Sequence, residues 1–199
     1  MKPLRRTQAE RTEEMRARLA RAAFEVIASR GLSAFRTAAV AEAAEVSQGA
    51  LLHHFPTKDD VTLAAIEFAL ARATQASQKR LARSFRNTGA VLDTMHEDFR
   101  EFFLGDNFWV TLDITLGASK GAPLKSAIRK LVAAYRAPVY AAWAEKLCAY
   151  GIDNERASLI IRSLIAFVTG DAVRSLWTSE DDISKKLYAL WRENALRRE

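Results

Sequence analysis

The sequence predicts an all-α protein in which an N-terminal three-helix bundle precedes a larger helical region. Ala, Leu, Arg, Glu and Lys, which all favour helices, dominate the 199-residue chain. No stretch alternates strictly between apolar and polar residues beside an Asn-Gly or Asp-Gly turn, as hairpin strands do. Only 8 Gly and 4 Pro interrupt the chain, so we expect long helices with few breaks.

The composition narrows the class of protein further. Hydrophobic residues make up 49% and charged residues 27%, a balance typical of folded globular domains. The single cysteine, Cys148, excludes an intrachain disulfide and a CxxC metal site. No apolar run approaches the roughly 18 residues of a membrane span, and the start of the chain lacks the apolar core of a signal peptide. We therefore expect a cytoplasmic protein, mildly basic with a net charge of +6.

The first helix is expected over residues 12–30. Thr12 suits its N-cap, and Gly31 is a natural stop. Its inward positions recur at helical spacing and form one stripe. That stripe consists of Leu19, Ala23, Val26, Ile27 and Arg30.

Two short helices should follow, over residues 37–44 and 47–54. Only residues 45–47 separate them, and Ser47 among these is the N-cap of the second helix. Pro56 disfavours a helical backbone at Phe55 and so ends the second. Helices of about eight residues are marginal alone. Two of them in series after a full helix are typical of a helix-turn-helix unit, whose second short helix enters the major groove of DNA.

The rest of the chain is predicted to form long helices with short breaks. Thr57, followed by Asp60, resembles a capping box and should start the first of them. Glycines and an acidic cluster separate the others. Pro138 should kink or split the helix in which it lies. The expected ranges are 57–85, 90–104, 108–118, 123–150, 154–178 and 181–196.

Several residues of the helix-turn-helix unit have the properties that contact with DNA requires. Ser47, as N-cap, would leave backbone N–H groups and the positive end of the helix dipole free for a phosphate. Gly49 would let the backbone approach the duplex without a Cβ in the way. Gln48 can form a bidentate pair with an adenine edge, although it could also be a merely exposed residue at a helix start. Lys58 suits a phosphate contact.

Residues 31–58 resemble the N-terminal signature of the TetR family of transcriptional regulators, above all in the stretch Val-Ser-Gln-Gly-Ala-Leu-Leu-His-His-Phe-Pro-Thr-Lys at 46–58. Two positions depart from the family pattern. Leu52 stands where a tyrosine is common, and Glu45 stands where a glycine is common. A left-handed backbone at Glu45 would cost about 1 kcal/mol.

Together with the helix layout, the resemblance implies a helix-turn-helix DNA-binding domain over 1–56 and an effector-binding and dimerisation domain over 57–199. His53 should face outward toward a phosphate or a base, whereas His54 suits a structural or backbone contact. Two adjacent histidines point about 100° apart on a helix and cannot share a metal ion as an i, i+4 pair can. We expect neither a metal nor a cofactor. The candidate DNA contacts are Thr37, which should also cap its helix, Ser47, Gln48, Gly49, Ala50, His53, His54 and Lys58.

Basic residues outnumber acidic ones at the start of the chain, with Lys2, Arg5 and Arg6 ahead of the first helix. A basic arm in this position can follow the phosphate backbone or reach into the minor groove. A frayed and solvated terminus explains the same residues equally well. Charge alone therefore does not identify a DNA-binding protein.

The middle helices concentrate aromatic side chains, which indicate either an effector pocket or simply a well-filled core. A mainly apolar cavity with a few polar groups would suit a small hydrophobic or amphipathic effector. Trp109 and Asp113, at i and i+4, are the strongest individual candidates. The full set of candidate ligand-binding residues is Phe103, Trp109, Asp113, Trp143, Phe167 and Asp171.

Residues 154–178 are apolar nearly all round and must be covered on two sides. With the helix at 181–196 they suggest a four-helix homodimer interface, which the family resemblance also implies. The expected protein is a ligand-responsive regulator, a repressor more readily than an activator. As a dimer it would bind a palindromic operator in double-stranded DNA and be released by an effector through a shift in population.

An enzyme and a binding protein without DNA affinity are the two other classes of protein that a helical chain of this kind could represent. Enzyme motifs such as Gly-x-Ser-x-Gly, His-Glu-x-x-His and a phosphate-binding glycine loop are missing from the sequence, so we do not expect an enzyme. The main alternative is a helical protein that binds a small molecule or a partner and no longer binds DNA. Leu52 and Glu45 are the residues that favour it.

Overall fold

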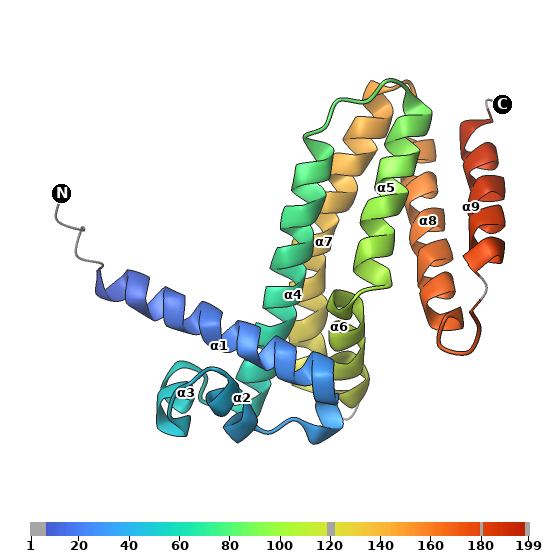
Figure 1. Ribbon diagram of the computed structural model, residues 1–199. Helices are drawn as coiled ribbons and strands as arrows, with labels where there is room; N and C mark the ends of the chain where they lie inside the picture. Colours follow the sequence, from blue (N-terminus) through green and yellow to red (C-terminus); the bar gives the residue numbers. More distant parts are fainter. Residues whose placement is uncertain (1–6, 119–121, 180, 198–199) are drawn as a thin grey trace. The chain divides into compact units, whose positions relative to one another are not determined.

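The computed structural model describes residues 7–118, 122–179 and 181–197, which form nine α-helices and one short 3₁₀ turn without a strand (Figure 1). The all-α prediction is confirmed. None of these helices is both long and apolar enough to cross a membrane. The elements are α1 (Gln8–Arg30), η1 (Leu32–Ala34), α2 (Thr37–Ala43), α3 (Gln48–His54), α4 (Lys58–Leu81), α5 (Thr88–Phe103), α6 (Asp106–Gly117), α7 (Ala122–Ala149), α8 (Asn154–Arg174) and α9 (Asp181–Leu196).

The chain packs as two compact units. The first contains the described residues up to Ala71 together with Trp109–Val132, and the second contains Arg72–Phe108 together with the described residues from Ala133 onward. Helices α4, α6 and α7 contribute residues to both units. The functional division at residue 56 stays a prediction, because a packing unit need not coincide with a functional domain.

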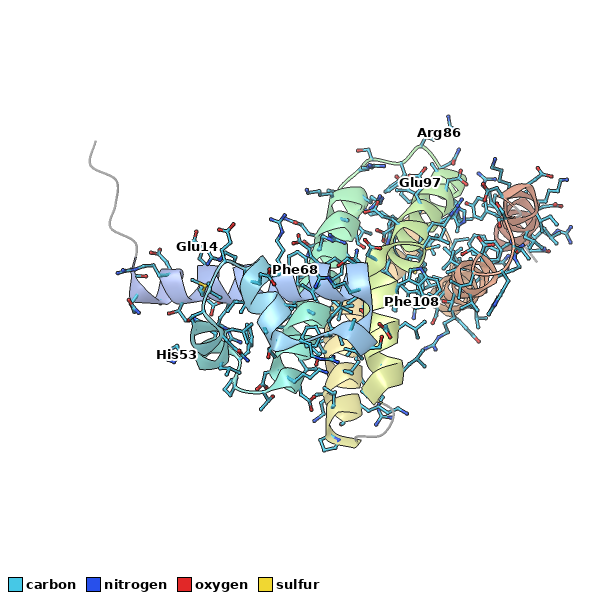
Figure 2. All side chains as sticks on the ribbon, turned by 60° about the horizontal axis from the view of Figure 1, so that its bottom comes forward. Glu14, His53, Phe68, Arg86, Glu97 and Phe108 are labelled. Atoms are coloured by element: carbon cyan, nitrogen blue, oxygen red, sulfur yellow. The ribbon has the colours of Figure 1, made fainter. Side chains whose placement is uncertain are left out.

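In the first unit, α1 packs against α2 and η1, and α2 packs against α3 (Figure 1). Four residues of the predicted stripe of α1, namely Leu19, Ala23, Val26 and Ile27, are buried there, whereas the fifth, Arg30, is exposed. Phe68 of α4 lies under α1, with its ring 5.4 Å from the ring of Phe24 (Figure 2). The first half of α4 therefore belongs to the core that holds the short helices.

In the second unit, α5 packs against α8 and α9, which also contact each other. Its core is built from large apolar side chains, of which Trp143, Phe99 and Leu147 are fully buried. A polar network crosses the unit as well. Asp93 of α5 accepts hydrogen bonds from the Tyr188 hydroxyl at 2.8 Å and from Arg192 Nε at 2.6 Å, both on α9.

The start of α1 differs from the prediction. Thr7, not Thr12, is the N-cap: its hydroxyl accepts from the backbone N–H of Glu10 at 3.2 Å, while the Glu10 carboxylate accepts from the Thr7 N–H at 2.7 Å. This reciprocal capping box satisfies two free donors. Thr12 lies inside the helix, where its hydroxyl donates to the Gln8 carbonyl at 3.0 Å.

Two helices end earlier than predicted, because the side chain that follows each of them does not pack in a way that would continue the helix. α4 ends at Leu81, and Phe85 packs instead beside Trp143 and Tyr150, while its carbonyl accepts from the Tyr150 hydroxyl at 2.6 Å. α8 ends at Arg174, beyond which Trp177 is 76% exposed and offers no packing that would extend the helix.

Pro138 does not split α7, so that part of the prediction is wrong. The helix runs unbroken from Ala122 to Ala149. A proline removes the hydrogen bond to the carbonyl four residues earlier, which here belongs to Ala134. Both residues are exposed, so water can hydrate that carbonyl.

Candidate nucleic-acid interface and effector-binding residues

The turn between α2 and α3 is closed by backbone hydrogen bonds. Glu45 has φ of 52° and is the one non-glycine residue with positive φ in the described chain. The N–H of Val46 donates to the Ala41 carbonyl at 2.9 Å, as in a Schellman helix end. Val40, Ala41 and Leu51 are buried and join the two helices. Glu45 therefore has a left-handed backbone, at a cost of about 1 kcal/mol.

The N-terminus of α3 is capped and open to solvent. The Ser47 hydroxyl accepts from the Ala50 N–H at 3.1 Å, which confirms Ser47 as the N-cap. Gln48 and Gly49 are exposed, and Ala50 is half-buried. A Cβ built on Gly49 would meet only the Ser47 hydroxyl, at an ordinary 3.9 Å. Packing within the protein thus gives no reason for a glycine at this position.

The C-terminal end of α3 is held by α1. Arg16 Nη1 donates to the His54 carbonyl at 2.7 Å, and its guanidinium lies 4.4 Å from the centre of the Phe55 ring. His53 is exposed and points away from the neighbouring helices (Figure 2). Burial lowers the pKa of His54, and the nearby positive charges of His53 and Arg16 lower it further. His54, the last residue of α3, is therefore protonated less readily than an ordinary histidine.

The remaining DNA candidates lie at helix starts. Thr37 is half-buried at the first position of α2, but the N-cap is Arg36, so the prediction that Thr37 caps the helix is wrong. Lys58 is exposed at the start of α4, with its ammonium 5.4 Å from the ring of Phe35. The predicted capping box ahead of Lys58 is present: the Asp60 N–H donates to the Thr57 hydroxyl at 3.1 Å, and the Thr57 N–H donates to Asp60 at 2.9 Å.

The predicted basic arm lies mostly outside the described residues. Lys2, Arg5 and Arg6 fall in the segment 1–6, which the structure does not describe. All eight candidate DNA contacts, in contrast, belong to the first unit.

The six candidate effector residues do not all share one unit. Trp109 and Asp113 belong to the first unit, whereas Phe103, Trp143, Phe167 and Asp171 belong to the second. Asp113 has a clear structural partner, because its carboxylate accepts from the Leu32 N–H at 2.6 Å. It thereby ties α6 to the turn that leads from α1 into α2.

The four candidates of the second unit have different surroundings. Phe103 is buried with its ring 5.0 Å from both Phe102 and Phe108. Trp143 is fully buried, and its indole N–H donates to Asp98 at 3.0 Å. The half-buried ring of Phe167 lies 6.2 Å from that of His96.

Asp171, the fourth of these, joins α8 to α9. Its carboxylate accepts from the Ser184 hydroxyl at 2.6 Å and from Arg174 Nη2 at 2.8 Å. Burial alone would raise the pKa of Asp171, but these two hydrogen bonds and nearby arginine charges outweigh it and lower the pKa. Asp171 thus links α8 and α9 through its hydrogen bond with Ser184.

Two buried charged residues in the second unit escaped the sequence analysis. Asp98 is 3% exposed and accepts from Ser77 at 2.9 Å as well as from Trp143. Burial raises the pKa of Asp98 despite those hydrogen bonds and the charges of Arg136 and Arg80. Arg136 is 2% exposed. A signal was available, since each interrupts an apolar helical stripe: Val91, Met95, Asp98 and Phe102 in α5, and Arg136, Val139, Trp143 and Leu147 in α7.

Helices α8 and α9 carry a large share of the exposed apolar surface. Leu159 on α8 is 60% exposed and Leu190 on α9 is 57% exposed. A shallow hollow of about 690 Å³ lies between these helices, lined by Leu159 and Trp191 among others. The other large exposed apolar residues in this region are Leu176, Trp177, Ile183 and Leu187.

Comparison with known proteins finds a family model and a relative that match this chain. Residues 19–65 match the model for bacterial regulatory proteins of the tetR family. The HTH-type transcriptional regulator CymR of Pseudomonas putida is 38% identical over 182 residues, which cover 92% of this chain and 89% of that protein.

Two solved structures illustrate the shared fold. One is a protein from Saccharomonospora viridis described as a transcriptional regulator, in complex with choline, with a TM-score of 0.72 and 22% identity over 94% of this chain and 100% of that one. The other is FadR from Bacillus subtilis, in complex with stearoyl-CoA, with a TM-score of 0.59 and 16% identity over 87% and 96% of the two chains. Likeness at these identities establishes a common fold.

Proposed function

The chain belongs to the TetR family of bacterial regulatory proteins, and from this premise we propose that it is a ligand-released repressor that binds a palindromic operator as a homodimer in the cytoplasm. The observation that carries the DNA-binding part is the N-terminus of α3. Ser47 caps this helix start, and Gln48 is exposed there. At Gly49 the protein's own packing leaves room for a Cβ.

A helix start of this kind suits both parts of DNA recognition. Backbone N–H groups at a helix N-terminus attract phosphate, and a close approach brings the Gln48 amide within reach of a base edge. Thr37 and Lys58, which flank α3 in sequence, and His53 within α3 would add phosphate contacts. Ala50 and His54 would lie at the edge of the same surface. In this proposal residues 1–56 form the DNA-binding domain and 57–199 the effector and dimerisation domain.

Dimerisation is supported by the exposed apolar side chains of α8 and α9, led by Leu159 and Leu190. Large apolar patches on a folded chain commonly mark interfaces. A two-fold dimer would present two α3 helices to half-sites one or more turns apart.

Effector release is supported by the contact between α6 and the turn after α1. The Asp113 carboxylate accepts a hydrogen bond from the Leu32 N–H. Gly117 lies so close to Leu32 that a Cβ built on it would approach the Leu32 side chain to 2.4 Å. A small displacement of α6 would therefore move the entry to α2. Two proteins of this fold hold chemically unlike ligands, choline and stearoyl-CoA, so the effector class has to be inferred from this chain's own residues.

The proposal is tested by selecting fragments from random DNA with the purified protein, followed by mobility shifts on the selected sequence. We expect an inverted repeat, and an affinity that falls steeply with salt. Enrichment of no sequence would favour the alternative of a small-molecule-binding protein that no longer binds DNA.

Gly49→Ala provides a sharper test of the same surface. Alanine fits the free protein and favours helix by roughly 0.5–1 kcal/mol, so thermal stability should hold or rise. Operator affinity should nevertheless fall at least tenfold, because the added methyl group blocks the backbone from the phosphates. An unchanged affinity would contradict the proposed surface, and a fall in the unfolding midpoint would show that the alanine disturbs the protein itself.

A further inference from the structure

Arg136 is a buried cation whose hydrogen-bonding edge has no partner in the described part of the chain. The residue is 2% exposed, and its Nε, Nη1 and Nη2 have no hydrogen-bond partner among the residues that the structure describes. Its guanidinium carbon lies 4.4 Å from the centre of the Phe102 ring and 5.1 Å from that of Tyr140. All of these residues belong to the second unit.

The aromatic rings stabilise only part of this group. A cation over a ring face is favoured by the electrons of the ring, but the five N–H donors of a guanidinium lie in its plane and need acceptors. An unpaired ion inside a protein is strongly unfavourable. The position of Arg136 therefore calls for an anion at the edge of the guanidinium.

The nearby carboxylate is already engaged elsewhere. Asp98 accepts from Ser77 at 2.9 Å, from the Trp143 indole at 3.0 Å and from Arg80 at 3.4 Å. Arg80 also pairs with Glu101. The cluster of Arg80, Asp98, Glu101 and Arg136 thus contains two cations and two anions, but both anions pair with Arg80. Among the described residues of this cluster, Arg80 lacks a partner only at Nε, whereas Arg136 lacks one at all three nitrogens. The negative charge of Asp98 disfavours a further anion of high charge.

We propose that Arg136 anchors a single carboxylate on the effector, so that the effector is a small monocarboxylate with an apolar or aromatic body. A carboxylate matches the planar fork of a guanidinium in a bidentate pair. Phe102 and Tyr140 flank the guanidinium, and Phe99 lies 5.6 Å from the Tyr140 ring, so apolar surface adjoins the anion position. This inference rests on the proposed regulator function and assigns its ligand class.

The test uses benzoate, phenylacetate and octanoate as probes, with benzamide, phenylacetamide and octanamide as uncharged counterparts. Binding to the full-length protein is measured by calorimetry and by the rise in Tm. At least one carboxylate should bind, and its amide should bind roughly 10- to 100-fold more weakly, as expected for loss of a charge-assisted hydrogen bond. Failure of all three carboxylates, or equal binding of acid and amide, would overturn the proposal.

Arg136→Met keeps the apolar length of the side chain and removes its charge. Carboxylate affinity should fall by the same 10- to 100-fold, while the Tm without ligand should be unchanged or higher because an uncompensated buried cation has gone. Arg129→Met, at an exposed position of the same helix, is the matched control and should bind like the wild type. Undiminished binding by Arg136→Met would overturn the proposal, and so would a lower Tm without ligand, which would mean that Arg136 already has its anion within the protein.

Operator binding separates this proposal from the proposed function. A protein that shifts operator DNA but binds no carboxylate contradicts the Arg136 site alone. A protein that binds carboxylates through Arg136 but never shifts DNA contradicts the regulator function while leaving the site intact.

Discussion

At the scale of single residues, Glu45 shows that the turn between α2 and α3 tolerates a strained side chain. Its φ of 52° lies in the region that favours glycine. We expect Glu45→Gly to raise the free energy of unfolding by about 1 kcal/mol, measured by urea denaturation. Glu42→Gly, at an exposed position inside α2, is the control and should lower it by roughly 0.5–1 kcal/mol. A loss of stability in both variants would contradict the account of the turn.

His96 makes stability depend on pH. Its ring stacks on that of Tyr188 at 3.6 Å, and burial, with the charge of Arg100, lowers its pKa from 6.5 to about 4 despite Asp171 and Asp93, which raise it. Between pH 6.5 and 4 the unfolded chain binds a proton that the folded chain does not, so stability falls as pH falls. The slope from this group approaches ~1.4 kcal/mol per pH unit.

His96→Phe removes the imidazole that binds this proton and keeps an aromatic ring stacked on Tyr188. Urea denaturation at pH 7 and pH 4.5 should show a smaller loss of stability for this variant than for the wild type. His53→Phe, at an exposed position, should lose stability in parallel with the wild type. Parallel losses in all three proteins would show that His96 does not titrate as described.

At the scale of helices, sequence periodicity predicted where each helix lies better than where it ends. The buried stripe of α1 and the caps at Ser47 and Thr57 are local patterns and could be recognised directly. The end of α4 depends on the packing of Phe85 against Trp143, which lies far away in the chain. Such long-range packing leaves no local signal.

The same limit applies to the candidate site residues. α3 follows a contiguous motif, so its exposed residues could be named from the sequence. The spacing of Asp113 from Trp109 predicts a ligand contact, whereas its hydrogen bond to the backbone N–H of Leu32 has no signal in the sequence. Arg136 was overlooked because its significance depends on burial and on which neighbours Asp98 has already engaged.

The junction between α6 and η1 should depend on Asp113. Asp113→Ala leaves the Leu32 N–H without its acceptor, so we expect the free energy of unfolding to fall by about 1–3 kcal/mol, measured by urea denaturation. Asp113→Asn keeps an acceptor oxygen and should lose clearly less. If both variants matched the wild type, the contact would contribute nothing to the junction.

At the scale of the whole molecule, the apolar surface of α8 and α9 should decide the oligomeric state. We expect Leu159→Glu combined with Leu190→Glu to convert a dimer to a monomer, because two buried charges would oppose association. Light scattering after size exclusion would measure the mass, and operator affinity should fall with it. Leu116→Glu, 64% exposed in the first unit, is the control and should remain dimeric. A double variant that stays dimeric would place the interface elsewhere.

The participation of α4 in the core under α1 bears on attempts to exchange operator preference between related regulators. Phe24 packs on Phe68, twelve residues beyond Pro56, and Asp113 of α6 closes the turn at Leu32. A chimera joined at Pro56 would therefore set a foreign α4 and α6 against the native α1. A graft that transfers the chain up to Ala71 together with Trp109–Val132 keeps these contacts within one protein. We expect hybrids of this kind to fold with the transplanted α3.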